Sequence, residues 1–503
     1  MNILQAKEEV KRTIEIYLEK DEYGEYRIPY MKQRPIFLLG APGIGKTAII
    51  EQVAEETDLG LIVYSMTHHI RQSAVGLPFI VAREYDGTES RVTEYTMSEI
   101  IASAYNMMEN TGKRQGILFL DEINCVSETL SPSILQFLQY KSFGNRRLPP
   151  GWVIITAGNP PEYNRSVREF DIATRDRLKY INIEDDYQAW KAYAYDRGIH
   201  SSILSFLELN QNGFYSVRMT ADGAQYATAR GWEDLSYAIR QYEEKEFPVE
   251  LPLIQQYITD NDISRKYAVY YELYAKYKRD YKIDRILAGK VTRDVLKRAK
   301  DAGFDERIAV IEMLYEALNN GFEIVLRQQS VLEKTAEVLK DIKSLIYEKG
   351  ADSNEASELL LKRITSLKDE CRNRDESKSL SVEDKKISVA GENLLYGYLE
   401  MIRESKTAKK AFTEIRKSFD ALIKEQTELL HENGDRLEHV FSFLEEVWVT
   451  GREMMYFMTI LTTGKLSSTF IALHGSEGYA RHNDQMLLYD AKDELKTHII
   501  QNL

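Results

Sequence analysis

Cysteine is the scarcest chemically active residue in this sequence. Only Cys125 and Cys371 occur among 503 residues, and two such distant cysteines do not make the disulfide framework typical of secreted domains. We therefore expect a reducing compartment, the cytoplasm. The first twenty residues carry charges throughout and lack the apolar stretch of a secretory signal, so we expect no such signal.

Long apolar runs and an excess of basic residues are missing as well. No stretch of eighteen apolar residues occurs, so we predict no transmembrane helix. Lys and Arg total 66 against 79 Asp and Glu, which gives a formal net charge of −13. Because general duplex binding needs a basic surface, the charge balance disfavours nucleic acid as a partner.

Short apolar runs that alternate with helical patterns dominate the first 185 residues. The runs are Ile36–Leu39, Leu61–Tyr64, Gly116–Asp121, Trp152–Ile155 and Leu178–Ile183. Strands buried on both faces and separated by helices predict an α/β fold with a five-stranded parallel sheet. Between the second and third runs, β-prone residues flank Asp86-Gly87, which predicts an inserted β-hairpin over Phe79–Tyr95.

A phosphate-binding loop follows the first of these runs. The motif G-x-x-x-x-G-K-[ST] is matched by Gly40, Ala41, Pro42, Gly43, Ile44, Gly45, Lys46 and Thr47, with Ala48 next in the helix that begins there. A strand before the motif and a helix after it are the context that confirms it. The pattern predicts ATP binding: Lys46 adds positive charge at the β- and γ-phosphates, and the Thr47 hydroxyl reaches Mg²⁺.

Two carboxylates and an amide stand at the ends of later runs. Asp121 ends the third run and is predicted to hold Mg²⁺, while Glu122 is placed to polarise the attacking water as a general base. Asn159 lies just beyond the fourth run and could orient that water, although Asn159-Pro160 also favours a simple turn. Together these residues predict an ATPase.

The first 240 residues resemble the AAA+ ATPases, and within them the MoxR-like branch. The resemblance is carried by the phosphate-binding loop and by Val75-Gly76-Leu77-Pro78, Asp121-Glu122-Ile123-Asn124, Ala157-Gly158-Asn159-Pro160 and Asp171 through Arg177. It implies that Asn159 is the sensor-1 residue and that Arg177 is the arginine finger, with Arg175 as its rival. A finger acts on the neighbouring subunit's nucleotide, so the resemblance also implies a ring, usually a hexamer.

The resemblance further implies a small helical lid that carries a sensor-2 arginine. Arg230 fits best, although Ala229 replaces the proline usual in that motif, and Arg218 is the alternative. We therefore expect an AAA+ core over 1–185, a helical lid over 186–262 and an α-helical extension over 263–503. Heptad-like spacing in the extension predicts antiparallel coiled-coil character. Its segment 350–391 is either a flexible linker or the tip of a helical hairpin.

The resemblance implies a chaperone-like role for the chain. MoxR-like proteins commonly work beside von Willebrand factor A-domain proteins and assist the maturation of other proteins, so we expect a ring that remodels a protein client. An ATP-dependent conformational switch or scaffold with slow turnover is the alternative. A nucleic-acid motor is a third interpretation, and the acidic balance speaks against it.

Tyrosines form a stripe in the helical half of the chain. Their positions are Tyr267, Tyr270, Tyr274, Tyr277 and Tyr281, with Tyr271 beside them. This spacing places them on one helix face. We favour packing of that face inside the protein over a partner-binding surface.

Overall fold

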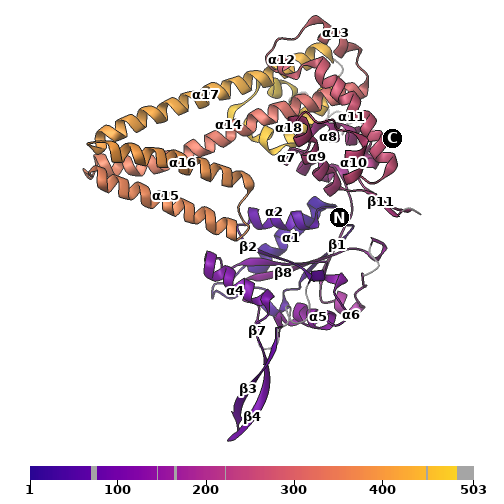
Figure 1. Ribbon diagram of the computed structural model, residues 1–503, viewed down its shortest axis with the longest axis vertical. Coiled ribbons are helices and arrows are strands. Elements are labelled where there is room, and N and C mark those ends of the chain that lie inside the picture. Colours follow the sequence, from indigo (N-terminus) through magenta and orange to yellow (C-terminus); the bar gives the residue numbers. More distant parts are fainter. Residues whose placement is uncertain (69–75, 144–145, 164–166, 221–222, 449–450, 484–503) are drawn as a thin grey trace, which may run out of the picture. The chain divides into compact units, whose positions relative to one another are not determined.

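The computed structural model describes residues 1–68, 76–143, 146–163, 167–220, 223–448 and 451–483 (Figure 1). The chain divides into two compact units. The first consists of Met1–Ala189 together with Thr365–Lys386. The second consists of Trp190–Ile364 together with the described part of Ile387–Leu503.

Five parallel strands form the sheet of the first unit, in the order β2-β5-β8-β1-β9. Their bounds are β1 Ile36–Gly40, β2 Gly60–Ser65, β5 Gly116–Asp121, β8 Trp152–Gly158 and β9 Lys179–Ile183. All seven residues of β8 are buried, which explains why it reads as a continuous apolar run. Each predicted run lies in a strand, so the predicted α/β core is confirmed.

Helices pack on both faces of this sheet. Their bounds are α1 Ile3–Leu18, α2 Lys46–Glu56, α4 Glu99–Thr111, α5 Ser131–Tyr140 and α6 Ile172–Arg175, with short 3-10 turns at Tyr30–Lys32, Met66–His68, Ile123–Cys125 and Pro161–Tyr163. In Figure 1, α1 and α2 lie on one side of the sheet and α4 on the other. Ile100 and Phe137 of α4 and α5 share a buried cluster with Leu118 of β5, so one apolar layer joins helices to strands.

The inserted hairpin is present where the sequence predicts it. It pairs β3 (Pro78–Tyr85) with β4 (Thr88–Tyr95) and projects away from the sheet (Figure 1). Asp86 and Gly87 adopt φ of 49° and 75°, the left-handed values of a tight two-residue turn. A second, two-residue pair joins β6 (Ser142–Phe143) to β7 (Arg146–Arg147).

The second unit is largely helical. Its shorter elements are α7 Tyr187–Asp196, which begins in the first unit, α8 Ser201–Leu209, the 3-10 turn Gln211–Gly213, β10 Ser216–Thr220, β11 Gly223–Ala227, α9 Ala229–Glu244, α10 Leu251–Tyr257, α11 Asn261–Tyr281, α12 Ile283–Leu287, α13 Arg293–Asp301, α18 Arg452–Thr463 and α19 Lys465–His474. The strands β10 and β11 form an antiparallel hairpin. The other elements of the unit are long helices.

Long helices account for the predicted coiled-coil character. They are α14 Phe304–Tyr347, α15 Ser353–Glu376, α16 Val382–Glu404 and α17 Ala408–Val447. Val331, Val338 and Ile342 of α14 are buried at the predicted spacing, and α14 packs against α17. Residues 350–391 contain α15, the turn after it and the first part of α16. The boundaries predicted for a core, a lid and an extension stay predictions.

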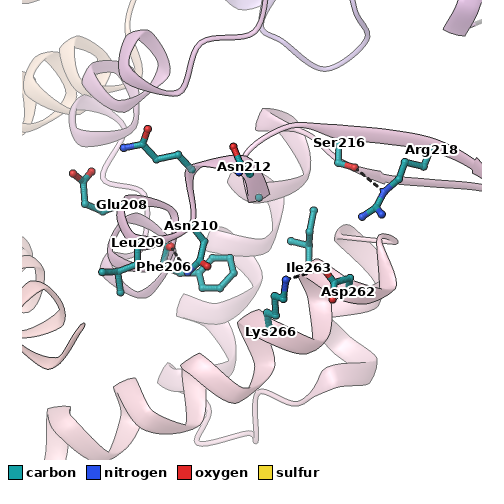
Figure 2. Close-up of a pocket in the computed structure, with 12 residues that line it drawn as sticks. Phe206, Glu208, Leu209, Asn210, Asn212, Ser216, Arg218, Asp262, Ile263 and Lys266 are labelled. Atoms are coloured by element: carbon teal, nitrogen blue, oxygen red, sulfur yellow. Dashed lines mark hydrogen bonds and ion pairs between the residues drawn. The ribbon is translucent and has the colours of Figure 1, made fainter. Parts of the chain in front are cut away.

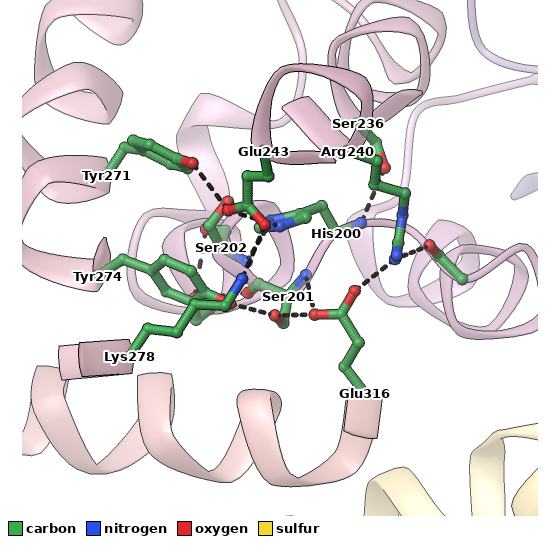
Figure 3. A network of polar contacts seen from close by, with 12 residues as sticks. His200, Ser201, Ser202, Ser236, Arg240, Glu243, Tyr271, Tyr274, Lys278 and Glu316 are labelled. Carbon is green, nitrogen blue, oxygen red and sulfur yellow. Dashed lines mark hydrogen bonds and ion pairs between the residues drawn. The ribbon is translucent and has the colours of Figure 1, made fainter. Parts of the chain in front are cut away.

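The tyrosine stripe is buried, in agreement with the packing interpretation. Tyr267, Tyr274 and Tyr281 are almost fully buried on α11, and Figure 3 shows the polar network that receives some of their hydroxyls. Tyr274 and Ser201 form a hydroxyl–hydroxyl hydrogen bond of 2.5 Å. Tyr271 donates to Glu243 at 2.8 Å. These aromatic rings therefore fix α11 within its unit.

Candidate functional site

The glycine-rich loop joins the carboxyl end of β1 to the amino end of α2. Gly43 and Gly45 adopt φ of 74° and 99°, values that residues with a side chain rarely adopt. A Cβ at Gly40 would lie 2.7 Å from the carbonyl oxygen of Ile183, so this position has no room for a side chain. The loop thus leads directly into a helix amino terminus, an arrangement that favours phosphate.

Lys46 is the first residue of α2 and is only 8% exposed. Its Nζ donates to the carbonyl oxygens of Gly40 at 2.7 Å and Ala41 at 2.9 Å, and to Asn159 Oδ1 at 2.8 Å. The ammonium group is therefore held in the mouth of the loop, next to the predicted sensor. Phosphate oxygens are stronger, charged acceptors and can replace these neutral ones.

Thr47 and Asp121 fit a magnesium site. The Thr47 hydroxyl donates to Asp121 Oδ2 at 3.0 Å, which brings the start of α2 to the end of β5. Mg²⁺ is commonly held by one or two protein oxygens, with phosphate and water completing its shell. Within the described ranges, no group of three or more His, Cys, Asp or Glu side chains is placed to hold a metal. A magnesium ion here would therefore depend on the nucleotide.

Glu122 follows Asp121 in a left-handed backbone conformation, with φ of 54°. Its backbone N–H donates to Asp121 Oδ1 at 2.8 Å, which stabilises this turn. Its Oε2 accepts hydrogen bonds from Ser65 at 3.2 Å and Thr67 at 2.9 Å, at the carboxyl end of β2. The carboxylate is thus oriented by the neighbouring strand of the sheet.

The backbone of Asn159 is anchored by Asn124, which ends the segment Asp121-Glu122-Ile123-Asn124. Asn124 Nδ2 donates to the backbone oxygen of Asn159 at 2.8 Å. A Cβ at Gly158 would lie 2.4 Å from Asn124 Oδ1, so glycine there leaves space for that amide. Asn124 therefore positions the segment in which Asn159 presents its side chain to Lys46.

Sequence reasoning missed Ser65, Thr67 and Asn124. The two hydroxyl residues follow a predicted strand, but their contact with Glu122 requires that β2 lie next to β5. The sequence alone does not give that strand order. Polar residues at the carboxyl ends of several strands are the signal that could have marked them, because ligands bind at this edge of parallel sheets.

The two candidate finger arginines differ in their surroundings. Arg175 lies over the ring of Tyr180, with Cζ 4.8 Å from the ring centroid, a cation–π contact. Arg177 is exposed and interacts electrostatically with the carboxylate of Asp171. Asp171 caps the short helix α6 just before them by accepting from Thr174 N at 2.7 Å.

The two candidate lid arginines lie in the second unit. Arg218, on β10, donates from Nε to Asp260 Oδ2 at 3.0 Å, and Asp260 is buried. Burial raises the pKa of the Asp260 carboxyl group, whereas the hydrogen bonds from Ile263 N and Arg218 lower it. The net result is a lowered pKa. Arg230 is exposed in the first turn of α9, whose cap is Thr228. Arg218 thus belongs to a structural ion pair, and among the described residues no such pair is found for Arg230.

A polar cavity of about 560 Å³ lies in the second unit (Figure 2). Phe206 and Ile263 form its apolar side, and Asn210, Asn212 and Lys266 contribute polar groups. Lys266 is paired with Asp262 at 2.8 Å, so this cation is already neutralised. The cavity is separate from the phosphate-binding loop, which belongs to the first unit.

The sheet order and the loop geometry define a class of protein. A parallel sheet carries a glycine-rich loop after β1, an Asp-Glu pair at the end of β5 and an asparagine after β8. Loop, lysine, hydroxyl and carboxylate are the parts from which P-loop nucleotide-binding domains are built. The first unit is therefore a P-loop domain.

Comparison with protein families identifies the branch. Residues 35–178 match the family described as the AAA domain of the dynein-related subfamily. This part of the chain is an AAA domain, which confirms the resemblance found in the motifs, and ATP is the nucleotide that such a domain binds. The match covers the sheet and its site residues and leaves the second unit unassigned.

Other comparisons are less informative. A crystal structure from Cytophaga hutchinsonii, described as a candidate ATPase, is similar with 14% identity and a TM-score of 0.23, over 51% of this chain and 84% of its own. No curated protein matches. Among the described residues, no helix is both long and apolar enough to cross a membrane.

Proposed function

We propose that this chain hydrolyses ATP in a ring of identical subunits and uses the energy to remodel a protein partner. The observation that carries the proposal is the convergence of four side chains. Lys46, Asp121, Glu122 and Asn159 come from the carboxyl ends of β1, β5 and β8, and hydrogen bonds link Lys46 to Asn159 and Asp121 to Thr47. Neighbouring strands thus bring the side chains that would bind phosphate, Mg²⁺ and the attacking water to the carboxyl edge of the sheet.

Each residue has a role that its geometry supports. Lys46 binds the β- and γ-phosphates, and Thr47 and Asp121 hold Mg²⁺, which neutralises charge on the transferring phosphoryl group. Glu122 accepts the proton of the attacking water. Because Oε2 of Glu122 accepts hydrogen bonds from Ser65 and Thr67, we assign the acceptance of the proton to Oε1. Asn159 orients the water beside the γ-phosphate.

The finger completes the site from the neighbouring subunit. An arginine finger has to reach away from its own subunit, and Arg177 is exposed, with a charge interaction to Asp171. Arg175 is engaged with Tyr180. We therefore assign the finger to Arg177. Its cation would stabilise charge on the γ-phosphate in the transition state, an effect typically of about 10³- to 10⁵-fold. A closed ring, usually a hexamer in such ATPases, satisfies every site.

Hydrolysis is coupled to a client through the helical region. Arg230 is our candidate for the lid residue that senses the γ-phosphate, since Arg218 is held by Asp260. The client is a protein, with a von Willebrand factor A-domain protein as the partner class that the MoxR-like resemblance favours. The cytoplasm is the proposed location, consistent with neither Cys125 nor Cys371 forming a disulfide among the described residues.

The test is ATP turnover per subunit as a function of protein concentration. We expect specific activity to rise with concentration as subunits assemble, and Arg177→Ala to lower kcat by about 10³-fold while nucleotide binding persists. Arg175→Ala is the matched control, because it removes an arginine from the same segment. That control should keep turnover within about threefold of wild type, since we assign it no role beyond its contact with Tyr180.

Other outcomes would change the assignment. Loss of turnover in Arg175→Ala with normal turnover in Arg177→Ala would exchange the two roles. Turnover that is independent of concentration, and normal in both variants, would contradict a shared site and favour a slow conformational switch. Absence of any turnover with intact ATP binding would contradict the ATPase itself.

A further inference from the structure

The edge strand of the sheet is covered by a distant part of the chain. β2 is the outermost strand, so one of its sides has no neighbouring strand. On that side the backbone N–H of Leu61 donates to the carbonyl oxygen of Ser377 at 3.0 Å. Ser377 lies at the turn between α15 and α16, and this turn belongs to the first unit by its contacts. The hairpin tip thus satisfies an edge group that would otherwise face solvent.

Side chains reinforce this contact at the turn between α2 and β2. Lys113 Nζ donates to Asp58 Oδ1 at 2.8 Å and to Ser379 Oγ at 2.6 Å. Ser379 Oγ also lies within hydrogen-bond distance of Asp58 Oδ1, at 3.3 Å, and Arg374 Nε lies 3.8 Å from the same oxygen. Ser379 is completely buried although it is polar. A buried hydroxyl with several partners marks a specific contact rather than loose packing.

The tip is held in shape by its own bonds. The backbone N–H of Ser379 donates to the carbonyl oxygen of Arg374 at 2.9 Å, and Arg374 Nη2 donates back to the Ser379 oxygen at 3.2 Å. The hydroxyls of Ser377 and Ser379 are 2.9 Å apart. Lys378, between them, adopts the left-handed conformation with φ of 52°. The tip therefore presents its groups to the core with little additional ordering cost.

The two core elements touched by the tip both reach the nucleotide site at their other ends. β2 begins beside Ser377 and ends at Ser65, whose hydroxyl orients Glu122. α2 begins at Lys46 and ends just before Asp58. Since β2 is an edge strand, it has a single strand neighbour in the sheet, and the tip adds a second backbone contact to those that α2 and α4 make with it. α2 is additionally tied to α1 through ion pairs, so the tip matters more for β2 than for α2.

We propose that the α15–α16 tip, Arg374 through Ser379, is a positioning element for the ATPase site. It fixes β2, and β2 in turn fixes the general base Glu122 through Ser65 and Thr67. This inference depends on the proposed ATPase function. It predicts that the tip supports the chemical step rather than ATP affinity, because Lys46 and the phosphate-binding loop are held by other contacts.

The test compares two double variants of the full chain. Arg374→Ala with Ser379→Ala removes the side chains that meet Asp58 and Lys113. Arg372→Ala with Ser366→Ala is the matched control, because among the described residues Arg372 forms ion pairs with Asp369 and Glu376 of its own helix and Ser366 is exposed. We expect the tip variant to lower kcat at least about threefold, with the Kd for ATP unchanged within about twofold. The control should keep both constants.

A core-side variant keeps the test decisive if the tip variant folds poorly. Asp58→Asn removes the charge that meets Lys113 and Arg374 and suits the left-handed backbone at this position, φ 52°. It should also lower kcat. The triple variant Arg374→Ala, Ser379→Ala, Asp58→Asn should lose no more activity than the more severe of the tip variant and Asp58→Asn, since both changes act through one contact.

The outcomes separate this inference from the proposed function. An inactive wild-type chain contradicts the proposed function. An active wild type whose tip variant keeps its kcat overturns the positioning role alone, even when its melting temperature falls. A tip variant with raised kcat, or additive losses with Asp58→Asn, also overturns it.

Discussion

The phosphate-binding site of the first unit and the His200 network of the second unit are built from similar groups but differ in access. Thr47, Asp121 and Glu122 are only partly buried. His200, Ser201 and Ser202 are at most 2% exposed. In the phosphate-binding site, the groups form hydrogen bonds with one another that a ligand can replace. In the His200 network, the groups are buried between helices and stabilise their packing.

The comparison shows that composition does not separate a reaction site from a structural network. His200 Nδ1 lies 2.7 Å from Ser202 Oγ, and His200 Nε2 lies 3.4 Å from Glu243 Oε1, an order of groups that resembles a hydrolase triad. Yet the His200 side chain also accepts from Ser202 N, and Ser202 bonds to Tyr267 inside the unit. Burial and full use of the hydroxyl leave no access for a substrate.

The largest effect should come from the general base. Glu122→Gln keeps the size of the side chain and its bonds to Ser65 and Thr67 but cannot accept a proton. We expect turnover to fall by about 10²- to 10⁴-fold, with ATP binding and melting temperature preserved. A steady-state assay measures turnover, nucleotide titration measures ATP binding, and thermal unfolding gives the melting temperature. A variant with near-normal turnover would remove Glu122 from the mechanism.

The reverse pattern is expected in the His200 network. Glu243 accepts from Tyr271 at 2.8 Å and Lys278 at 2.7 Å, and lies near His200. Burial alone would raise the pKa of Glu243, but His200 and Lys278 lower it well below its usual range. Glu243→Ala should destabilise the fold by about 3 kcal/mol, because it leaves these partners uncompensated.

The adjacent Glu244 gives the control for that prediction. It is exposed and, in the part of the chain that the structure describes, accepts a 3.3 Å hydrogen bond from Gln241, three residues earlier on the same helix. Glu244→Ala should change the free energy of unfolding by less than about 0.5 kcal/mol. Denaturant unfolding measures both variants. Equal effects of the two substitutions would show that the network does not stabilise the second unit.

A pH dependence should distinguish the units further. Glu312 is completely buried, Tyr195 donates to its Oε1 at 2.7 Å, and Tyr456 donates to the same oxygen. Burial raises the pKa of Glu312 to about 7. The native state therefore binds a proton that the unfolded state releases near pH 4.5, so stability falls as the pH rises through 7.

The size of this effect follows from the two pKa values. From pH 5 to pH 8, Glu312 should reduce the free energy of unfolding by about 2 to 3 kcal/mol. Glu312→Gln should remove that part of the dependence, which melting temperatures of both proteins at the two pH values would reveal. Identical pH profiles for wild type and variant would show that Glu312 does not titrate in this range.

Much of the first unit could be predicted because its signals are local. The run Ile36–Leu39, the loop from Gly40 to Thr47 and the pair Asp121-Glu122 each occupy a few consecutive residues. Their order along the chain indicates a P-loop domain, and hairpin chemistry at Asp86-Gly87 is equally local. The packing of the tyrosine stripe was also predictable, from helical periodicity.

Contacts between distant residues decided the rest. Ser65 meets Glu122 because β2 lies beside β5, and Ser377 meets Leu61 although more than 300 residues separate them. The segment 350–391 is rich in Ser, Asp, Glu and Lys and has no aromatic residue, so its pattern left linker and helical hairpin open.

The sequence by itself determined the nucleotide-binding class, the five strands and the glycine-rich loop after the first of them, since each depends on neighbours along the chain. Only the tertiary structure decided which strands lie at the sheet edges and which distant segment contacts β2. Those features depend on non-local packing, which no local pattern encodes.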